Sequence, residues 1–286
     1  MLSQIFKKPP DYGMLLAMRQ QLVRVLEASG AERRDLRRDF AGHARRLPLP
    51  LPLVFGTRKL KIHFDSYQSK SLAVASYSQF EAPPESGSFT DFAFQLRPVS
   101  QVTAPLLHGE ALRPMPGNRG MFTADLYNTS PGWLDLTSFV EERCPAWLQA
   151  IEIVKPFQKT KAQGRGKFTR HLEPYKSPYR IELAEPRVDS GEHKPYFEAV
   201  GKAFEAIIRG YLDALDRMPE TMDPKPIASN EQGFDRFFDT LCRKDFAVKM
   251  GRFLLKRDFD AYFHQGFWGA ALPVPGRASQ EGGQCI

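Results

Sequence analysis

Residues 93–128 decide the fold, and they read AFQLRPVSQVTAPLLHGEALRPMPGNRGMFTADLYN. A turn at residues 116–120 separates two extended arms. After the turn, Phe122, Ala124 and Leu126 alternate with residues of a different character. This period of two predicts a strand with two unlike faces.

Each arm of this predicted hairpin carries one carboxylate, Glu110 before the turn and Asp125 after it. A carboxylate on a strand loses hydration when it is buried, and it is then either satisfied by partners or functional. The plain alternative is that both acids face solvent on an ordinary hairpin.

Alternating patterns continue outward from the hairpin. They predict strands near residues 59–65, 72–81, 89–97 and 179–183. Short turns between successive strands indicate an antiparallel meander, because parallel neighbours need a crossover helix between them.

Helical patterns flank the strands on both sides. Residues 14–46 are predicted to be helical, and the strongest apolar stripe begins near Lys194 and runs to Leu215. A second helical pair is predicted at residues 234–267. The order of helices, meander and helices favours one antiparallel sheet between helical layers.

Composition is that of a globular protein, with 286 residues, 42% hydrophobic and 26% charged. Its three cysteines (Cys144, Cys242 and Cys285) are far apart and form no CxxC pair, so neither a disulfide framework nor a thiolate zinc site is expected. We find no signal-peptide pattern, and the most apolar run, residues 47–55, is broken by three prolines. A cytoplasmic protein without membrane spans is the expectation.

Positive charge is concentrated in residues 155–180. This segment holds eight Lys and Arg residues against one acid, Glu173, so its excess of seven equals the net charge of +7 of the whole chain. Such a surface attracts an acidic partner, which is a nucleic acid, an anionic small molecule or an acidic protein.

Several chemistries are excluded by missing motifs. The sequence has no GxSxG elbow, no HExxH and no nucleotide fingerprint, and its six histidines lack metal-ligand spacing. An enzyme built on this chain would work with carboxylates and without a tightly bound dinucleotide or metal.

Local motifs in residues 58–269 resemble one known family. PLLHGE at residues 105–110 is similar to its P-x-x-G-x-D motif, and TADL at residues 123–126 to its A-D-L strand. RKDFA at residues 243–247, with Phe267 and Trp268 following, is similar to its D-P-A … L-F ending. In this order the motifs resemble those of the ferredoxin-dependent bilin reductases and of red chlorophyll catabolite reductase.

The resemblance implies a three-layer α/β/α sandwich with a linear tetrapyrrole between the central antiparallel sheet and the C-terminal helices. It implies electrons from reduced ferredoxin and no bound cofactor. The resulting domain prediction is an N-terminal helical segment with a proline-rich connector at residues 1–57, a reductase-like domain at 58–269 and a disordered tail at 270–286. We expect a monomer, and whether residues 1–57 belong to the core is left open.

The resemblance also assigns site residues. Glu110 stands at the position of the family's sheet aspartate and Asp245 at that of its helical aspartate, so both are predicted proton donors. The family's histidine falls on Ala93, and Glu81 has the spacing of another family carboxylate. His108 could orient Glu110. The predicted substrate-binding residues are Glu81, Ala93, His108 and Asp125. For Asp125, a structural or solvent-facing role is favoured.

Two other functions stay open. A tetrapyrrole-binding protein without catalysis would explain the loss of the histidine at Ala93. A nucleic-acid binder would use residues 155–180, but aromatics are sparse there and no RNA-binding motif accompanies them. For the reductase, the same segment is expected to dock ferredoxin, or alternatively to bind propionates. Which tetrapyrrole and which double bond are reduced is undetermined.

Overall fold

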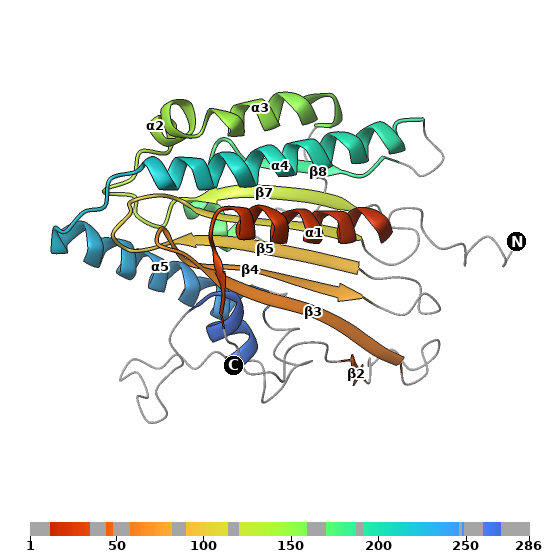
Figure 1. The fold of residues 1–286 in the computed structure, drawn as a ribbon, viewed down its shortest axis with the longest axis horizontal. Coiled ribbons are helices and arrows are strands. Elements are labelled where there is room, and N and C mark those ends of the chain that lie inside the picture. Colours follow the sequence, from red (N-terminus) through yellow and green to blue (C-terminus); the bar gives the residue numbers. More distant parts are fainter. Residues whose placement is uncertain are drawn as a thin grey trace, which may run out of the picture.

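A computed structural model describes residues 12–34, 44–47, 58–81, 90–113, 120–158, 170–186, 191–245, 248 and 260–269 (Figure 1). The predicted tail at residues 270–286 and part of the basic segment, residues 159–169, lie outside these ranges.

The centre of the fold is one antiparallel sheet. Its main strands are β3 (Arg58–Gln68), β4 (Leu72–Glu81), β5 (Thr90–Pro98), β6 (Leu106–Arg113), β7 (Met121–Tyr127) and β8 (Ile181–Ala184), which lie side by side in this order. Two short strands, β1 (Glu32–Arg33) and β2 (Ala44–Leu47), pair with β3 at the opposite edge from β8. The predicted meander is confirmed, and its two arms are β6 and β7.

Apolar residues at every second strand position form the first face of the sheet. Phe92, Phe94 and Leu96 of β5 and Phe122 of β7 are fully buried in one hydrophobic core. The helices α1 (Tyr12–Ala28) and α4 (His193–Arg217) cover this face (Figure 1). Further out, α4 is covered by α3 (Pro145–Val154), which follows the short helix α2 (Leu136–Ser138) and the π-helical turn η4 (Phe139–Arg143).

Helices from the C-terminal part of the chain cover the second face. They are α5 (Pro224–Lys244) and the π-helix η9 (Asp260–Phe267), and they enclose a second hydrophobic core. Two short 3₁₀ helices, η5 (Lys155–Phe157) and η7 (Arg170–Tyr175), lie on the path from α3 to β8. The predicted three-layer α/β/α arrangement is therefore confirmed.

The predicted helix over residues 14–46 is wrong in its length. Helix α1 ends at Ala28, because Gly30 adopts a left-handed φ of +76° and Ala31 N–H returns to Leu26 C=O at 3.0 Å. The charged residues that follow carry no apolar stripe, and Glu32–Arg33 pairs with β3 instead. Within α1, Leu15, Met18 and Leu22 are buried in the first core, so this part of residues 1–57 belongs to the core.

Candidate functional site

The candidate site is a cavity of about 230 Å³ between the second face of the sheet and the C-terminal helices. Its sheet wall carries polar side chains, among them Ser78, Asp91, His108, Glu110, Thr123 and Asp125. Its helical wall is mostly apolar, with Phe237, Leu241, Val248, Tyr262, Phe267 and Trp268. An aromatic helical wall opposite a polar sheet wall suits a flat, largely apolar ligand with a few polar groups.

Strand register explains why these side chains meet. Ala93 of β5 lies opposite Glu110 of β6, which lies opposite Thr123 of β7. In the next row, His108 of β6 lies opposite Asp125 of β7. Directly paired residues share a face of the sheet, so the two rows form adjacent lines of the cavity floor.

The structure brings five of the six predicted site residues together at this cavity. Ala93, His108, Glu110 and Asp125 line it from the sheet, and Asp245 lines it from the end of α5. The sixth, Glu81, stands at the far end of β4 opposite Thr90 and is not among the described lining residues.

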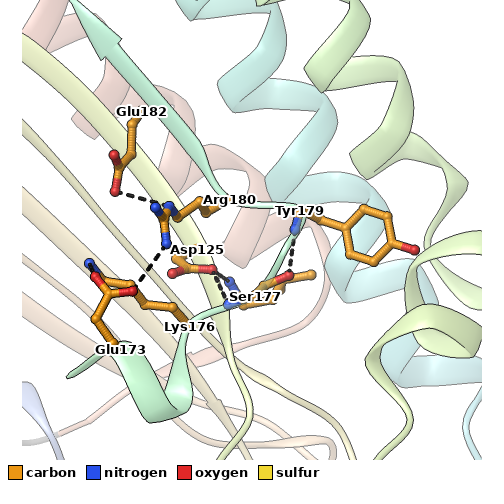
Figure 2. Close-up of polar contacts among 8 residues, drawn as sticks. Asp125, Glu173, Lys176, Ser177, Tyr179, Arg180 and Glu182 are labelled. Atoms are coloured by element: carbon orange, nitrogen blue, oxygen red, sulfur yellow. Dashed lines mark hydrogen bonds and ion pairs between the residues drawn. The ribbon is translucent and has the colours of Figure 1, made fainter. Parts of the chain in front are cut away.

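Asp125 is the carboxylate most strongly affected by its surroundings. Its side chain is only 6% exposed. One oxygen, Oδ1, accepts hydrogen bonds from Leu126 N at 2.8 Å and from Ser177 N at 3.1 Å (Figure 2). Burial raises the pKa of Asp125 to about 7, although these two N–H groups and the nearby Arg180 and Lys176 act in the opposite direction. A carboxyl group with this pKa holds and releases a proton near neutral pH.

Two cations line the cavity beside Asp125 (Figure 2). Lys176 Nζ contacts Glu173 Oε1 at 2.8 Å. Arg180 contacts Glu173 at 3.5 Å and Glu182 at 3.3 Å. The hydrogen bond from Lys176 lowers the pKa of Glu173. This turn therefore offers positive charge at the cavity wall, held in place by two partly exposed acids.

His108 is a neutral histidine in an aromatic setting. Its ring lies 5.5 Å from Trp268 and 6.0 Å from Tyr127 between centroids. Burial lowers the pKa of His108 to about 4, although a hydrogen bond to the backbone of Phe94 acts in the opposite direction. The imidazole is thus uncharged at neutral pH.

Asp245 approaches the cavity from the opposite side to the sheet. It follows α5 as its C-terminal cap, with its N–H bonded to Leu241 C=O at 3.0 Å. Its Oδ1 accepts from Val248 N at 3.2 Å, and its Oδ2 lies 3.6 Å from His171 Nε2. Burial is the main cause that lowers the pKa of His171. Carboxyl groups therefore stand on both walls.

The sequence analysis named Asp125 with a structural or solvent-facing role favoured, and it did not single out Lys176 or Trp268 as lining a site. Asp125 received a structural role because its burial depends on Ser177, 52 residues further along the chain. One signal was present, since the alternation in β7 and the pairing of the two arms put Asp125 and His108 on one face. The register needed to use that signal was not known from the sequence.

Neither a metal cluster nor a membrane span is found in the described ranges. No group of three or more His, Cys, Asp or Glu side chains there is arranged to hold a metal ion. No helix there is both long enough and apolar enough to cross a bilayer.

Comparison with known proteins gives a likeness of fold. No protein family and no curated protein matches the sequence. Among solved structures, the chain is similar to SeMet-phytochromobilin synthase from tomato, crystallised in complex with biliverdin, with a TM-score of 0.63 over 87% of this chain and 82% of that chain. The two share a fold. Because only 12% of the aligned residues are identical, activity and ligand do not follow from this likeness.

Proposed function

We propose that this chain binds a linear tetrapyrrole in the cavity and reduces it with electrons from ferredoxin, and that Asp125 supplies a proton. The observation that carries the proposal is the buried Asp125 carboxyl group with a pKa of about 7 at a cavity with one polar and one aromatic wall. The fold it shares with a biliverdin-bound synthase supports the choice of ligand class.

The chemistry of a bilin matches both walls. Its conjugated system is flat and apolar, which suits Phe237, Phe267 and Trp268. Its propionates are anionic, and Lys176 and Arg180 offer positive charge at the cavity. Carboxylates form charge-assisted hydrogen bonds with such cations, so we assign these two residues to propionate binding.

Single-electron reduction of a conjugated tetrapyrrole produces an anionic radical that has to be protonated. Asp125 Oδ1 is occupied by two backbone N–H groups, so its proton resides on Oδ2. A donor whose pKa lies near the working pH transfers its proton most effectively. Glu110 and Asp245, the donors predicted from the sequence, remain candidates for a second proton, since both line the same cavity.

The experiment that tests this function is anaerobic reduction of biliverdin by the purified protein with reduced ferredoxin. The wild type is expected to form a coloured complex that converts to new bilin products. Asp125→Asn keeps the shape of the side chain and removes its acid, so we expect bilin binding within a few fold of wild type and reduction slowed by about 10²- to 10⁴-fold. The control is Asp213→Asn on the exposed side of α4, which should leave both quantities unchanged.

A non-catalytic tetrapyrrole carrier is the second candidate, and one observation favours it. Ala93, where the resembling family has a histidine, lines the cavity directly opposite Glu110. If biliverdin binds to the wild type but its spectrum stays unchanged with reduced ferredoxin, the carrier replaces the reductase.

A further inference from the structure

Several buried polar atoms at the cavity have no hydrogen-bond partner within the described part of the chain. They include Trp268 Nε1, His108 Nδ1 and Asp125 Oδ2. The Trp268 side chain is only 3% exposed, so the solvent around the protein does not readily satisfy its indole. Buried polar groups in proteins are nearly always bonded, and each unsatisfied one costs about 1–3 kcal/mol. Their grouping at one cavity points to a ligand that completes them.

These atoms differ in whether they donate or accept a hydrogen bond. An indole nitrogen is a donor only. A neutral imidazole has one N–H and one lone pair, and the pKa effect of Phe94 on His108 identifies a backbone carbonyl that takes the N–H. Nδ1, which has no partner, is then an acceptor. The two rings lie 5.5 Å apart between centroids, so the donor and the acceptor belong to neighbouring rings at the cavity.

We propose that Trp268 and His108 together recognise the amide edge of a lactam ring, which presents a C=O group next to an N–H group. The carbonyl oxygen accepts from Trp268 Nε1–H, and the lactam N–H donates to His108 Nδ1. This inference rests on the proposed function, since the end rings of a linear tetrapyrrole are lactams. The inference also orients the tetrapyrrole in the cavity. Asp125 is paired with His108 across the strands, so a terminal ring bound to His108 lies beside Asp125. This ring therefore receives the proton.

Side chains of the sheet hold the backbone around Trp268. Ser76 Oγ donates to Phe267 C=O at 2.7 Å, and Gln95 Nε2 donates to the same carbonyl. Arg97 donates to Trp268 C=O at 3.4 Å and to Gly269 C=O at 3.2 Å. With its backbone held in this way, the indole N–H is in place before a ligand arrives, which reduces the ordering cost of binding.

The test is Trp268→Phe, which keeps an aromatic ring and removes the N–H. We expect it to weaken biliverdin binding by about tenfold and to shift the lactam C=O stretch of the bound bilin to higher frequency. A loss of packing alone does not move that stretch in this direction. Trp133→Phe, at an indole that is 51% exposed, is the matched control and should change neither quantity.

A second measurement needs no variant of Trp268. The indole N–H proton of Trp268 in the wild-type protein should move downfield when biliverdin, or a two-ring dipyrrinone with one lactam, is added. If biliverdin binds but the indole N–H proton of wild-type Trp268 does not move, or the C=O stretch is the same in the wild type and in Trp268→Phe, the lactam inference is wrong and the proposed function stands. If neither probe binds to the wild type, the proposed function is wrong, and this inference with it.

Discussion

In the proposed function, the raised pKa that makes Asp125 a proton donor also reduces the stability of the folded protein. In the unfolded chain its carboxyl group ionises near its ordinary pKa of 3.8, whereas burial raises the pKa in the folded protein to about 7. Below pH 3.8 both states are protonated. Between pH 3.8 and 7 only the folded state keeps the proton, so the free energy of unfolding falls as pH rises, by roughly 4 kcal/mol in total.

This linkage predicts the pH dependence of stability in Asp125→Asn. The amide does not titrate, so the variant lacks this contribution. Between pH 5 and pH 8 the melting temperature of the wild type should fall by roughly 5–10 °C more than that of the variant. Thermal unfolding followed by circular dichroism measures this, with Asp213→Asn as a control that retains the wild-type slope. Parallel slopes for wild type and Asp125→Asn would show that the carboxyl group is not buried in solution.

The same carboxyl group sets the expected pH profile of reduction. Only protonated Asp125 can donate, so the rate of bilin reduction should fall as pH rises through about 7. The Lys176 and Arg180 charges beside it favour the ionised form. Propionates that neutralise these charges would therefore shift the fall to higher pH in the complex than in the free protein.

At the residue scale, a local pattern is enough to place Glu110 and His108 on one face of a strand, but it does not reveal the burial of Asp125. The two former residues lie on one strand, where a period of two reveals which side chains share a face. Asp125 needs a distant partner, Ser177, whose N–H holds Oδ1. A contact of this kind depends on how the turn after η7 approaches β7, and no repeat in the sequence carries that information.

Among the elements, α5 determines the width of the cavity. It approaches the segment that follows β7 closely at Gly233, where an added Cβ would lie 1.7 Å from Thr129 C=O. The same helix carries Phe237, Leu241 and Asp245 to the cavity. A glycine at this position therefore allows α5 to pack closely against the segment that follows β7.

Gly233→Ala should displace α5 from the end of β7 and weaken the site. We expect a loss of roughly 1–3 kcal/mol in the free energy of unfolding and a measurable loss of bilin affinity. Gly201→Ala in α4 is the matched control, since a Cβ there meets nothing within 4 Å. That change should stabilise the protein by up to about 1 kcal/mol. Equal effects of the two substitutions, measured by denaturant unfolding, would contradict the assigned role of Gly233.

The sequence predicts helices that carry a long apolar stripe, but it predicts the positions of their ends less well. The apolar stripe from Lys194 to Leu215 predicted a helix, and the structure has α4 at His193–Arg217. The end of α1 was misplaced because charged residues after Gly30 resemble a solvated helix face, whereas in the fold Glu32 and Arg33 pair with Gln68 and Tyr67 of β3. Edge pairing of this kind depends on tertiary contacts.

On the scale of the whole molecule, one sheet separates the main hydrophobic core from the candidate site. Its first face is packed with apolar side chains under α1 and α4, and its second face carries the polar rows of the cavity under α5 and η9. Alternation in the sequence predicted two unlike faces. The family resemblance implied a ligand site between the sheet and the C-terminal helices, but local patterns could not reveal the cavity, because its walls come from three distant stretches that only the fold brings together.

Two larger expectations from the sequence stay predictions. The domain boundaries at residues 57 and 269 are one, and ferredoxin docking on residues 155–180 is the other. Within that segment, Lys176 and Arg180 line the cavity, so docking would depend on the remaining basic residues, several of which lie outside the described ranges.

The central claim, that the cavity between the sheet and the C-terminal helices binds a linear tetrapyrrole, is tested most directly by an absorbance titration with biliverdin. Three proteins are compared: the wild type, Ala93→Phe, which fills the cavity, and Ala17→Phe on the exposed side of α1. The wild type and Ala17→Phe should saturate with one equivalent and change the biliverdin spectrum, whereas Ala93→Phe should bind at least about tenfold more weakly. Equal binding by all three proteins, or none by the wild type, would contradict the claim.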